Sequence, residues 1–96
     1  MKKLNPAIIQ ENKTGEVLML GYMDRKALIM TKKEGVVYFW SRSRNKLWKK
    51  GETTGNLLKV IKIYTDCDSD AFLIKVRLIG NAVCHTGNRN CFYKII

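Results

Sequence analysis

Acidic residues are scarce in this sequence. Its 96 residues include 8 Asp and Glu against 18 Lys and Arg, which gives a formal net charge of +10. This imbalance predicts an anionic partner, which could be nucleic acid, an acidic surface or the phosphates of a small substrate. Charge alone does not choose among these partners.

Long apolar runs are also missing. No stretch approaches the roughly 18 apolar residues that a membrane span needs. The start, MKKLNPAIIQEN, has no apolar core of the kind found in a signal peptide. We therefore expect a cytoplasmic protein with no membrane partner. Because 46% of the residues are hydrophobic, we expect residues 1–96 to fold as a single small domain.

Cysteine and histidine are few, with three Cys and one His. Three cysteines cannot all pair within one chain. In the absence of an export signal, metal ligation or catalysis is a better explanation for them than disulfide bonds.

The order of apolar and turn-forming residues predicts a mostly β chain. Asp24 is the expected N-cap of a helix over 25–33, which Gly35 would end. Residues 44–56 are polar and predict a long functional loop, and the segment from residue 80 onward is rich in loop formers. Strands are predicted over 6–11, 17–23, 36–43, 57–68 and 71–79. The predicted fold class is α+β, mostly β: a small two-sheet sandwich or pseudobarrel with one clear helix.

The segment DCDSD (66–70) contains three of the eight acidic residues. If it is extended, Asp66, Asp68 and Asp70 point to one side of a strand and Cys67 to the other. A cluster of carboxylate oxygens suits a hard ion such as Mg²⁺. A solvated acidic turn is the alternative, and the pattern leaves both open.

The three cysteines, Cys67, Cys84 and Cys91, are separated by seventeen and seven residues, which matches no zinc-finger spacing. Three buried core cysteines are therefore a serious alternative to a metal site. The polar segment CHTGNRNC nevertheless favours zinc, since it is unsuited to a packed interior. Three thiolates and a water would leave the metal open for catalysis, and His85 could then move protons beside it. The alternative is that His85 only forms a hydrogen bond within its loop.

The segment WSRSRNKLWKKGETTGN concentrates basic, aromatic and glycine residues. Arginine forms bidentate contacts to phosphate, glycines let backbone amides approach an anion, and tryptophan can stack on a base. A single-stranded nucleic-acid platform and a solvated basic face fit the same composition. The predicted substrate contacts are Trp40, Ser41, Arg42, Ser43, Arg44, Lys50, Gly51, Glu52, Thr53, Thr54 and Gly55.

Taken in order, GEVLMLGYM, YFWSRSRNKLWKKGETTGN, DCDSDAFL and CHTGNRNCFY resemble the phosphoribosyl-AMP cyclohydrolase family of histidine biosynthesis. The resemblance covers nearly the whole chain. This sequence departs from the family pattern at Leu58, where Gln is usual, and at Asn90, where Ser is usual. It also has GNAVCHTG where GPACHTG is commoner.

The resemblance implies hydrolytic opening of the adenine ring of phosphoribosyl-AMP between N1 and C6, which yields the formimino-aminoimidazole carboxamide ribonucleotide. It further implies an intertwined homodimer in which Zn²⁺ is held by Cys67 of one subunit and by Cys84 and Cys91 of the other. Mg²⁺ is implied at Asp66, Asp68 and Asp70. A zinc-stabilised basic module that binds nucleic acid is the alternative function, and the acidic segment makes nucleic acid an unlikely partner.

Overall fold

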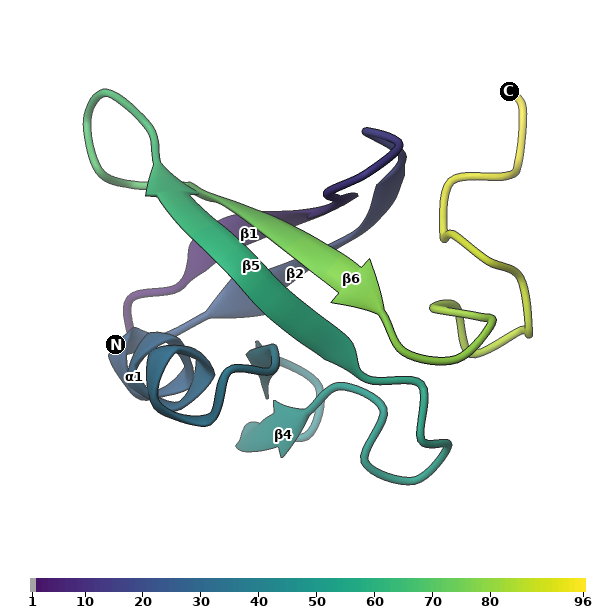
Figure 1. Ribbon diagram of the computed structural model, residues 1–96. Helices are drawn as coiled ribbons and strands as arrows, with labels where there is room; N and C mark the ends of the chain where they lie inside the picture. The colour runs from purple at the N-terminus through teal and green to yellow at the C-terminus, as the bar shows by residue number, and fades with distance from the viewer. Residues whose placement is uncertain (1) are drawn as a thin grey trace.

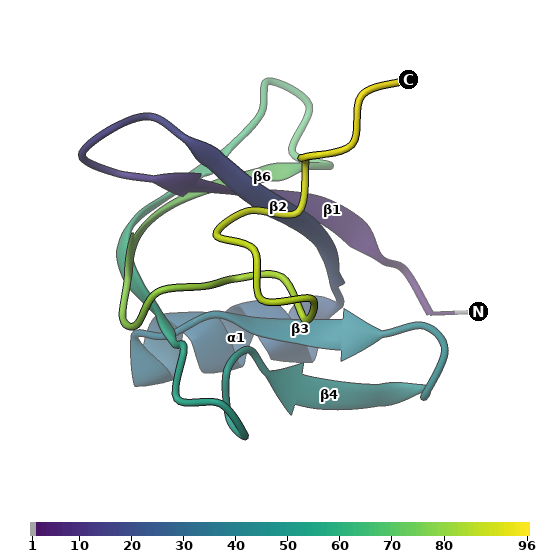
Figure 2. The same cartoon turned by 90° about the vertical axis from the view of Figure 1, so that its right-hand side faces the viewer.

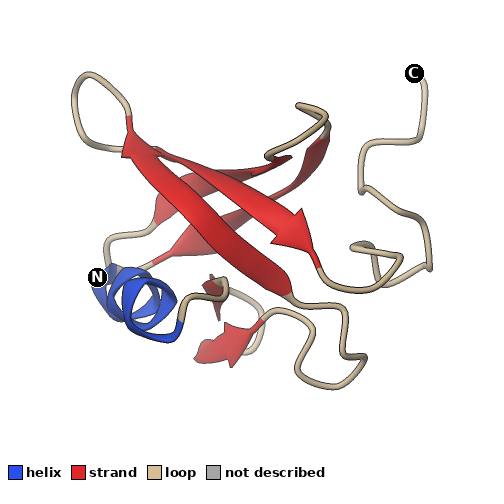
Figure 3. Cartoon of the chain, in the orientation of Figure 1, coloured by secondary structure: helices blue, strands red, loops and turns tan. Residues whose placement is uncertain are grey.

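Two β-sheets and one helix make up the computed structural model, which describes residues 2–96 (Figures 1 and 3). The larger sheet has the strand order β2-β1-β6-β5, and the smaller sheet pairs β3 with β4. In the larger sheet β1 pairs antiparallel with β2 and parallel with β6, while β5 and β6 are antiparallel. The elements are β1 (Asn5–Glu11), β2 (Val17–Met23), α1 (Arg25–Glu34), β3 (Tyr38–Ser41), β4 (Lys46–Lys49), β5 (Leu58–Thr65) and β6 (Phe72–Leu78).

The helix begins and ends where its capping residues predict. The Asp24 carboxylate accepts a hydrogen bond from the Ala27 amide at 2.8 Å, which satisfies one of the free donors of the first turn. Gly35 adopts the left-handed conformation with φ of 74° and donates its N–H to the Thr31 carbonyl. The predicted helix and the first two strands are confirmed. The last two strands are also present, but β5 ends at Thr65 and does not extend to residue 68 as predicted. The α+β, mostly β class is confirmed as well, while closure into a sandwich or pseudobarrel stays a prediction.

The prediction of an unbroken loop over 44–56 is wrong, because Lys46–Lys49 forms β4. The two strands of the small sheet place Trp48 opposite Phe39, and their ring centroids lie 5.5 Å apart. Packing against the buried Phe39 ring thus outweighs the polar composition of this segment. The strand expected over 36–43 is correspondingly shorter, since the chain turns over residues 42–45.

The core lies between the larger sheet and the layer made by α1 and the small sheet (Figure 2). Phe39 reaches the backbone of β2 at Gly21, where an added Cβ would lie 2.5 Å from the ring. The absence of a side chain at Gly21 is therefore what allows the small sheet to pack this closely. The largest fully buried side chains include Ile9, Leu18, Met23, Phe39, Leu58, Ile74 and Val76.

The opposite face of the larger sheet carries an apolar row. The strand register places Leu20, Ile8, Leu73 and Tyr64 side by side across β2, β1, β6 and β5. Leu20, Ile8 and Tyr64 are 42%, 38% and 46% exposed, so this row is open to solvent in the single chain. A contiguous apolar strip of this kind is typical of a surface that another molecule covers. No helix among residues 2–96 is both long enough and apolar enough to cross a lipid bilayer.

Candidate functional site

A cavity of about 580 Å³ opens between the segment that follows β4 and the loops that follow β6. Met19 of β2 and Trp48 of β4 contribute apolar lining, and Cys84, His85 and Cys91 contribute polar groups. The C-terminal segment reaches this position because it runs beside β2 (Figure 2), where the Cys91 amide donates to the Leu18 carbonyl at 2.8 Å. The cavity is therefore built from segments that lie far apart in the sequence.

Eight of the eleven predicted substrate contacts line this cavity, and Trp40, Arg42 and Gly55 do not. Trp40 and Arg42 instead engage other side chains: the Lys2 ammonium lies 4.0 Å from the Trp40 ring centre, and the Arg42 guanidinium lies 4.0 Å from that of Tyr22. The predicted contacts that line the cavity are Ser41, Ser43, Arg44, Lys50, Gly51, Glu52, Thr53 and Thr54.

Met19 and Asn56 also line the cavity, and sequence reasoning missed both. Met19 reads as an ordinary core residue of a strand, since it lies within an apolar run. Asn56 is the last residue of the predicted functional loop over 44–56 but was not among the predicted substrate contacts. Both residues lie within the motifs that resemble the cyclohydrolase family, and this is the signal that could have identified them.

Only two of the three predicted zinc ligands meet at the cavity. Cys84 and Cys91 both line it, whereas Cys67 lies in the turn between β5 and β6, far from the C-terminal loop in Figure 1. Among residues 2–96, the three thiols do not form a group close enough to hold one ion. A three-thiolate site would therefore need Cys67 from a second copy of the chain.

The two thiols at the cavity differ in their ionisation. The Thr86 hydroxyl donates to the Cys84 sulfur at 3.1 Å, and this hydrogen bond lowers the pKa of Cys84. Burial, and then the neighbouring Cys84, raises the pKa of Cys91. Lys50 is half-buried near both sulfurs, and burial lowers its pKa while the two thiols act in the opposite direction. Cys84, whose lowered pKa eases loss of the thiol proton, lies close to a second sulfur and an amino group, and sulfurs of this kind are donors that zinc binds.

His85 also faces the cavity, with Nδ1 4.0 Å from the Cys84 sulfur. The ring is exposed, so it can reach a molecule bound in the cavity. This position fits a proton carrier that lies beside the thiols without sharing their role as ligands.

The carboxylates of Asp66, Asp68 and Asp70 come together, with ligand oxygens within 4.8 Å of one another. The reason that we expected is wrong, because the segment forms a turn and is not extended. Ser69 has φ of 60°, and Asp66 Oδ1 accepts hydrogen bonds from the amides of Asp70 and Ala71 at 2.9 and 3.1 Å. The reversal of the chain, not the pleat of a strand, gathers the three side chains.

Crowding of these carboxylates affects their ionisation. Hydrogen bonding to Asp66 and Asp68, followed by repulsion from their charges, raises the pKa of Asp70. A cation would relieve this repulsion, and an all-oxygen donor set suits Mg²⁺.

Comparison with known proteins matches this chain to phosphoribosyl-AMP cyclohydrolases. Residues 19–93 match the family model for phosphoribosyl-AMP cyclohydrolase. A phosphoribosyl-AMP cyclohydrolase of Geobacter sulfurreducens is 56% identical over 97% of this chain and 74% of that protein. Proteins of the same name from Geobacter metallireducens and Syntrophotalea carbinolica are 55% and 56% identical over the same shares.

Proposed function

Because this chain belongs to the phosphoribosyl-AMP cyclohydrolase family, a family of hydrolases that act on a cyclic amidine, we propose that it opens the adenine ring of phosphoribosyl-AMP in histidine biosynthesis. The bond hydrolysed is N1–C6, and the product is the formimino-aminoimidazole carboxamide ribonucleotide. The observation that carries this proposal is the meeting of Cys84, Cys91 and His85 with the segment Gly51–Thr54 in one cavity.

The donor set at the cavity fits zinc. Cys84 and Cys91 supply two sulfurs, and we propose that Cys67 of a second copy supplies the third. When bound, zinc would lower the pKa of a water molecule towards about 7 and so provide hydroxide at neutral pH. Lys50, near both sulfurs, reduces the accumulated negative charge of the thiolates.

A homodimer supplies the missing sulfur. Cys67 and Cys91 lie at opposite corners of the larger sheet, whose edge strands are β5 and β2. Cys67 is in the turn after β5, and the Cys91 amide donates a hydrogen bond to the Leu18 carbonyl near the start of β2. A two-fold axis that pairs the exposed face of this sheet with itself can bring Cys67 of one copy to the cavity of the other. The same pairing would cover the apolar row that runs from Leu20 to Tyr64.

The chain's own groups then have distinct tasks. Arg44, Lys50 and the backbone amides of Gly51, Thr53 and Thr54 hold a phosphate of the substrate, while the Glu52 amide donates to the Lys49 carbonyl. Mg²⁺ held by Asp66, Asp68 and Asp70 of the second copy, which lie in the same turn as its Cys67, would bind the other phosphate.

Addition of water at C6 forms the C6–O bond and a tetrahedral carbon, and collapse of this carbon to the carboxamide breaks the C6–N1 bond. One proton of the water goes to the exocyclic nitrogen of the carboxamide, and the departing N1 must gain the other. His85, on the cavity wall beside Cys84, carries that proton.

Purified protein loaded with zinc is expected to convert phosphoribosyl-AMP to the ring-opened product, because the site brings the required groups together. The reaction would be followed by the change in ultraviolet absorbance and by identification of the product by mass. A dimer containing its full complement of zinc that leaves the substrate unchanged would refute the proposed function.

Magnesium affinity is expected to fall with decreasing pH, because the ion must compete with the proton on Asp70. The pKa of Asp70 lies above the ordinary value of 3.8, so the loss should begin at a higher pH than for an isolated aspartate. Asp68→Asn should weaken Mg²⁺ binding on the order of tenfold, since one charged ligand is removed. Calorimetric titration with Mg²⁺ from pH 4 to pH 8 measures both effects.

Glu34→Gln is the matched control for Asp68→Asn, because it removes one negative charge from an exposed position outside the cluster. It should leave Mg²⁺ affinity unchanged. Equal affinity of Asp68→Asn and the wild type would contradict the assignment of the magnesium site.

A further inference from the structure

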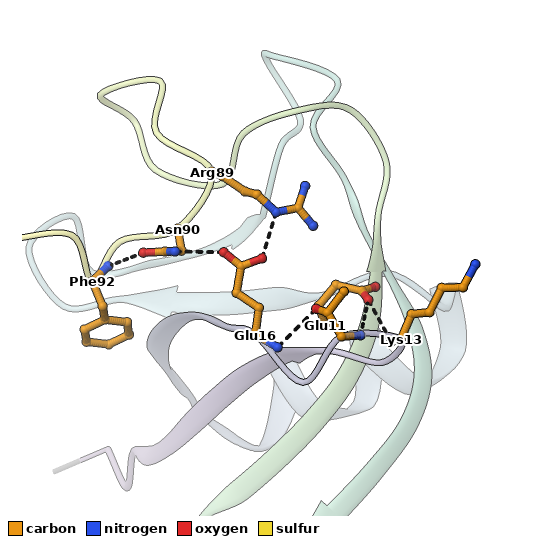
Figure 4. Close-up of polar contacts among 7 residues, drawn as sticks. Glu11, Lys13, Glu16, Arg89, Asn90 and Phe92 are labelled. Atoms are coloured by element: carbon orange, nitrogen blue, oxygen red, sulfur yellow. Dashed lines mark hydrogen bonds and ion pairs between the residues drawn. The ribbon is translucent and has the colours of Figure 1, made fainter.

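Glu16, which lies just before β2, joins this strand to the loop that carries Cys91 (Figure 4). Its Oε1 accepts a hydrogen bond from Arg89 Nε at 2.7 Å, and its Oε2 accepts one from Asn90 Nδ2 at 2.8 Å. The bond from Asn90 and then the bond from Arg89 lower the pKa of Glu16, so the carboxylate is charged at neutral pH. Both oxygens are thus engaged with the two residues that precede Cys91.

Asn90 extends this contact across Cys91. Its Oδ1 accepts a hydrogen bond from the Phe92 amide at 2.9 Å, so its side chain links Glu16 to the residue that follows Cys91 (Figure 4). The Cys91 amide itself donates to Leu18 at 2.8 Å. The backbone on both sides of the thiol is therefore held against the start of β2.

Glu16 is itself firmly placed. Its carbonyl accepts from the Glu11 amide at 2.8 Å and its amide donates to the Thr14 hydroxyl at 3.2 Å, within the turn that joins β1 to β2. The Glu16 side chain is only 27% exposed. The Arg89 side chain is more exposed, at 49%, so Glu16 holds the loop mainly through the geometry of its two hydrogen bonds and not through the charge of this surface ion pair.

No ladder of β-sheet hydrogen bonds can position Cys91, because residues 79–96 contain no helix or strand. Cys84 lies in a tight turn in which its amide donates to the Asn88 carbonyl and its carbonyl accepts from the Gly87 amide. The Val83 amide joins this turn to the Cys91 loop, since it donates to the Arg89 carbonyl at 3.1 Å. Glu16 therefore anchors, through Arg89 and Asn90, the segment that sets the separation of the two sulfurs.

We propose that Glu16 is a positioning residue for zinc binding, which holds Cys91 at the place where its sulfur and that of Cys84 can bind one ion. This role rests on the zinc site of the proposed function. It assigns a task to a carboxylate that touches neither the metal nor the substrate. Groups that orient metal ligands without binding the metal typically contribute a factor of about 10 to 100 in affinity.

The test compares zinc affinity in the full-length protein by competition with a chromophoric chelator. Glu16→Gln keeps the size of the side chain but replaces one acceptor oxygen with a donor, so it cannot accept both hydrogen bonds. We expect it to bind zinc about tenfold more weakly. With Co²⁺ in place of zinc, its thiolate-to-metal charge-transfer band should be weaker than that of the wild type.

Glu11→Gln is the matched control. Glu11 lies at the same turn and loses the same charge, but its carboxylate accepts hydrogen bonds from the amides of Lys13 and Thr14 and not from the Cys91 loop. Both bonds go to Oε1, an acceptor that glutamine keeps, so this variant removes the charge without removing a hydrogen bond, and zinc affinity should stay within about twofold of the wild type. Equal loss of zinc affinity in Glu11→Gln and Glu16→Gln would overturn the proposal, because the loss of one negative charge at this turn would then explain both.

Asn90→Ala is a second test of the positioning role of Glu16. It removes the bridge between Glu16 and Phe92, so it should also weaken zinc binding. In the double variant Glu16→Gln/Asn90→Ala, the loss of zinc-binding free energy should be smaller than the sum of the losses in the two single variants. Wild-type zinc affinity in both single variants would refute the role of Glu16. A wild-type protein that binds no zinc would instead overturn the proposed metal site itself.

Discussion

A mixture of the Cys67→Ala and Cys91→Ala variants is expected to recover about a quarter of wild-type activity, although neither variant is active alone. In the proposed dimer each metal site takes Cys67 from one subunit and Cys84 with Cys91 from the other. A heterodimer of the two variants therefore has one site that lacks both cysteines and one site that is complete. Random pairing makes about half of the dimers heterodimers, so about a quarter of all sites are intact.

Co-refolding of the two variants in equal amounts, followed by assay and zinc analysis, measures this recovery. A mixture of Cys84→Ala with Cys91→Ala is the matched control, since both residues line the same cavity of one chain. Every site in that mixture lacks a ligand, so it should stay inactive. Absence of recovery in heterodimers of the first pair, or full activity of Cys67→Ala alone, would show that the ligands are not shared between subunits.

Gly51→Ala is expected to impair both stability and substrate binding, whereas Gly55→Ala should lose only the stability that the strain of its positive φ costs. Both glycines have positive φ, 84° and 80°, so either substitution strains the backbone by roughly 1–2 kcal/mol. Only at Gly51 would the new Cβ overlap the backbone carbonyl of Asn56, while at Gly55 it would meet nothing within 4 Å. Relief of this overlap requires the loop to shift, which we expect to cost a further 1–3 kcal/mol or so.

The loop that would shift forms part of the cavity wall, because Gly51 and Asn56 both line it. Gly51→Ala should therefore raise the KM for phosphoribosyl-AMP by about tenfold or more, in line with the loss of one or two phosphate contacts. Chemical denaturation and steady-state kinetics of the two variants measure the two effects. Indistinguishable stability and KM in Gly51→Ala and Gly55→Ala would contradict the proposed tight packing of this loop.

Local chemistry made several features of the fold predictable. Asp24 and Gly35 mark the ends of α1 because a helix leaves unpaired amides and carbonyls that nearby residues must satisfy. The apolar pattern of β1 and β2 and the turn at Gly15 likewise act over only a few residues. The ordered motifs also led to the correct family, since they carry the residues of the cavity.

The acidic segment shows where such reasoning reaches its limit. Of the two geometries that the sequence left open for the three aspartates, the structure contains the turn and not the extended strand. The sequence placed the connection between the last two strands at residues 69 and 70, but β5 ends at Thr65, because the point at which its pairing with β6 stops is set by long-range packing of the sheet.

By itself, the sequence determined the capped helix, the strand-forming segments and the chemical groups available for a metal and a phosphate. Only the tertiary structure decided which of these groups meet. It turned Ser41 into the cavity and Trp40 away from it, separated Cys67 from Cys91, and brought Glu16 to Asn90 across 74 residues of chain. The physical reason is range: capping, turns and side-chain periodicity act between near neighbours, whereas contacts between distant segments follow from burying one common core.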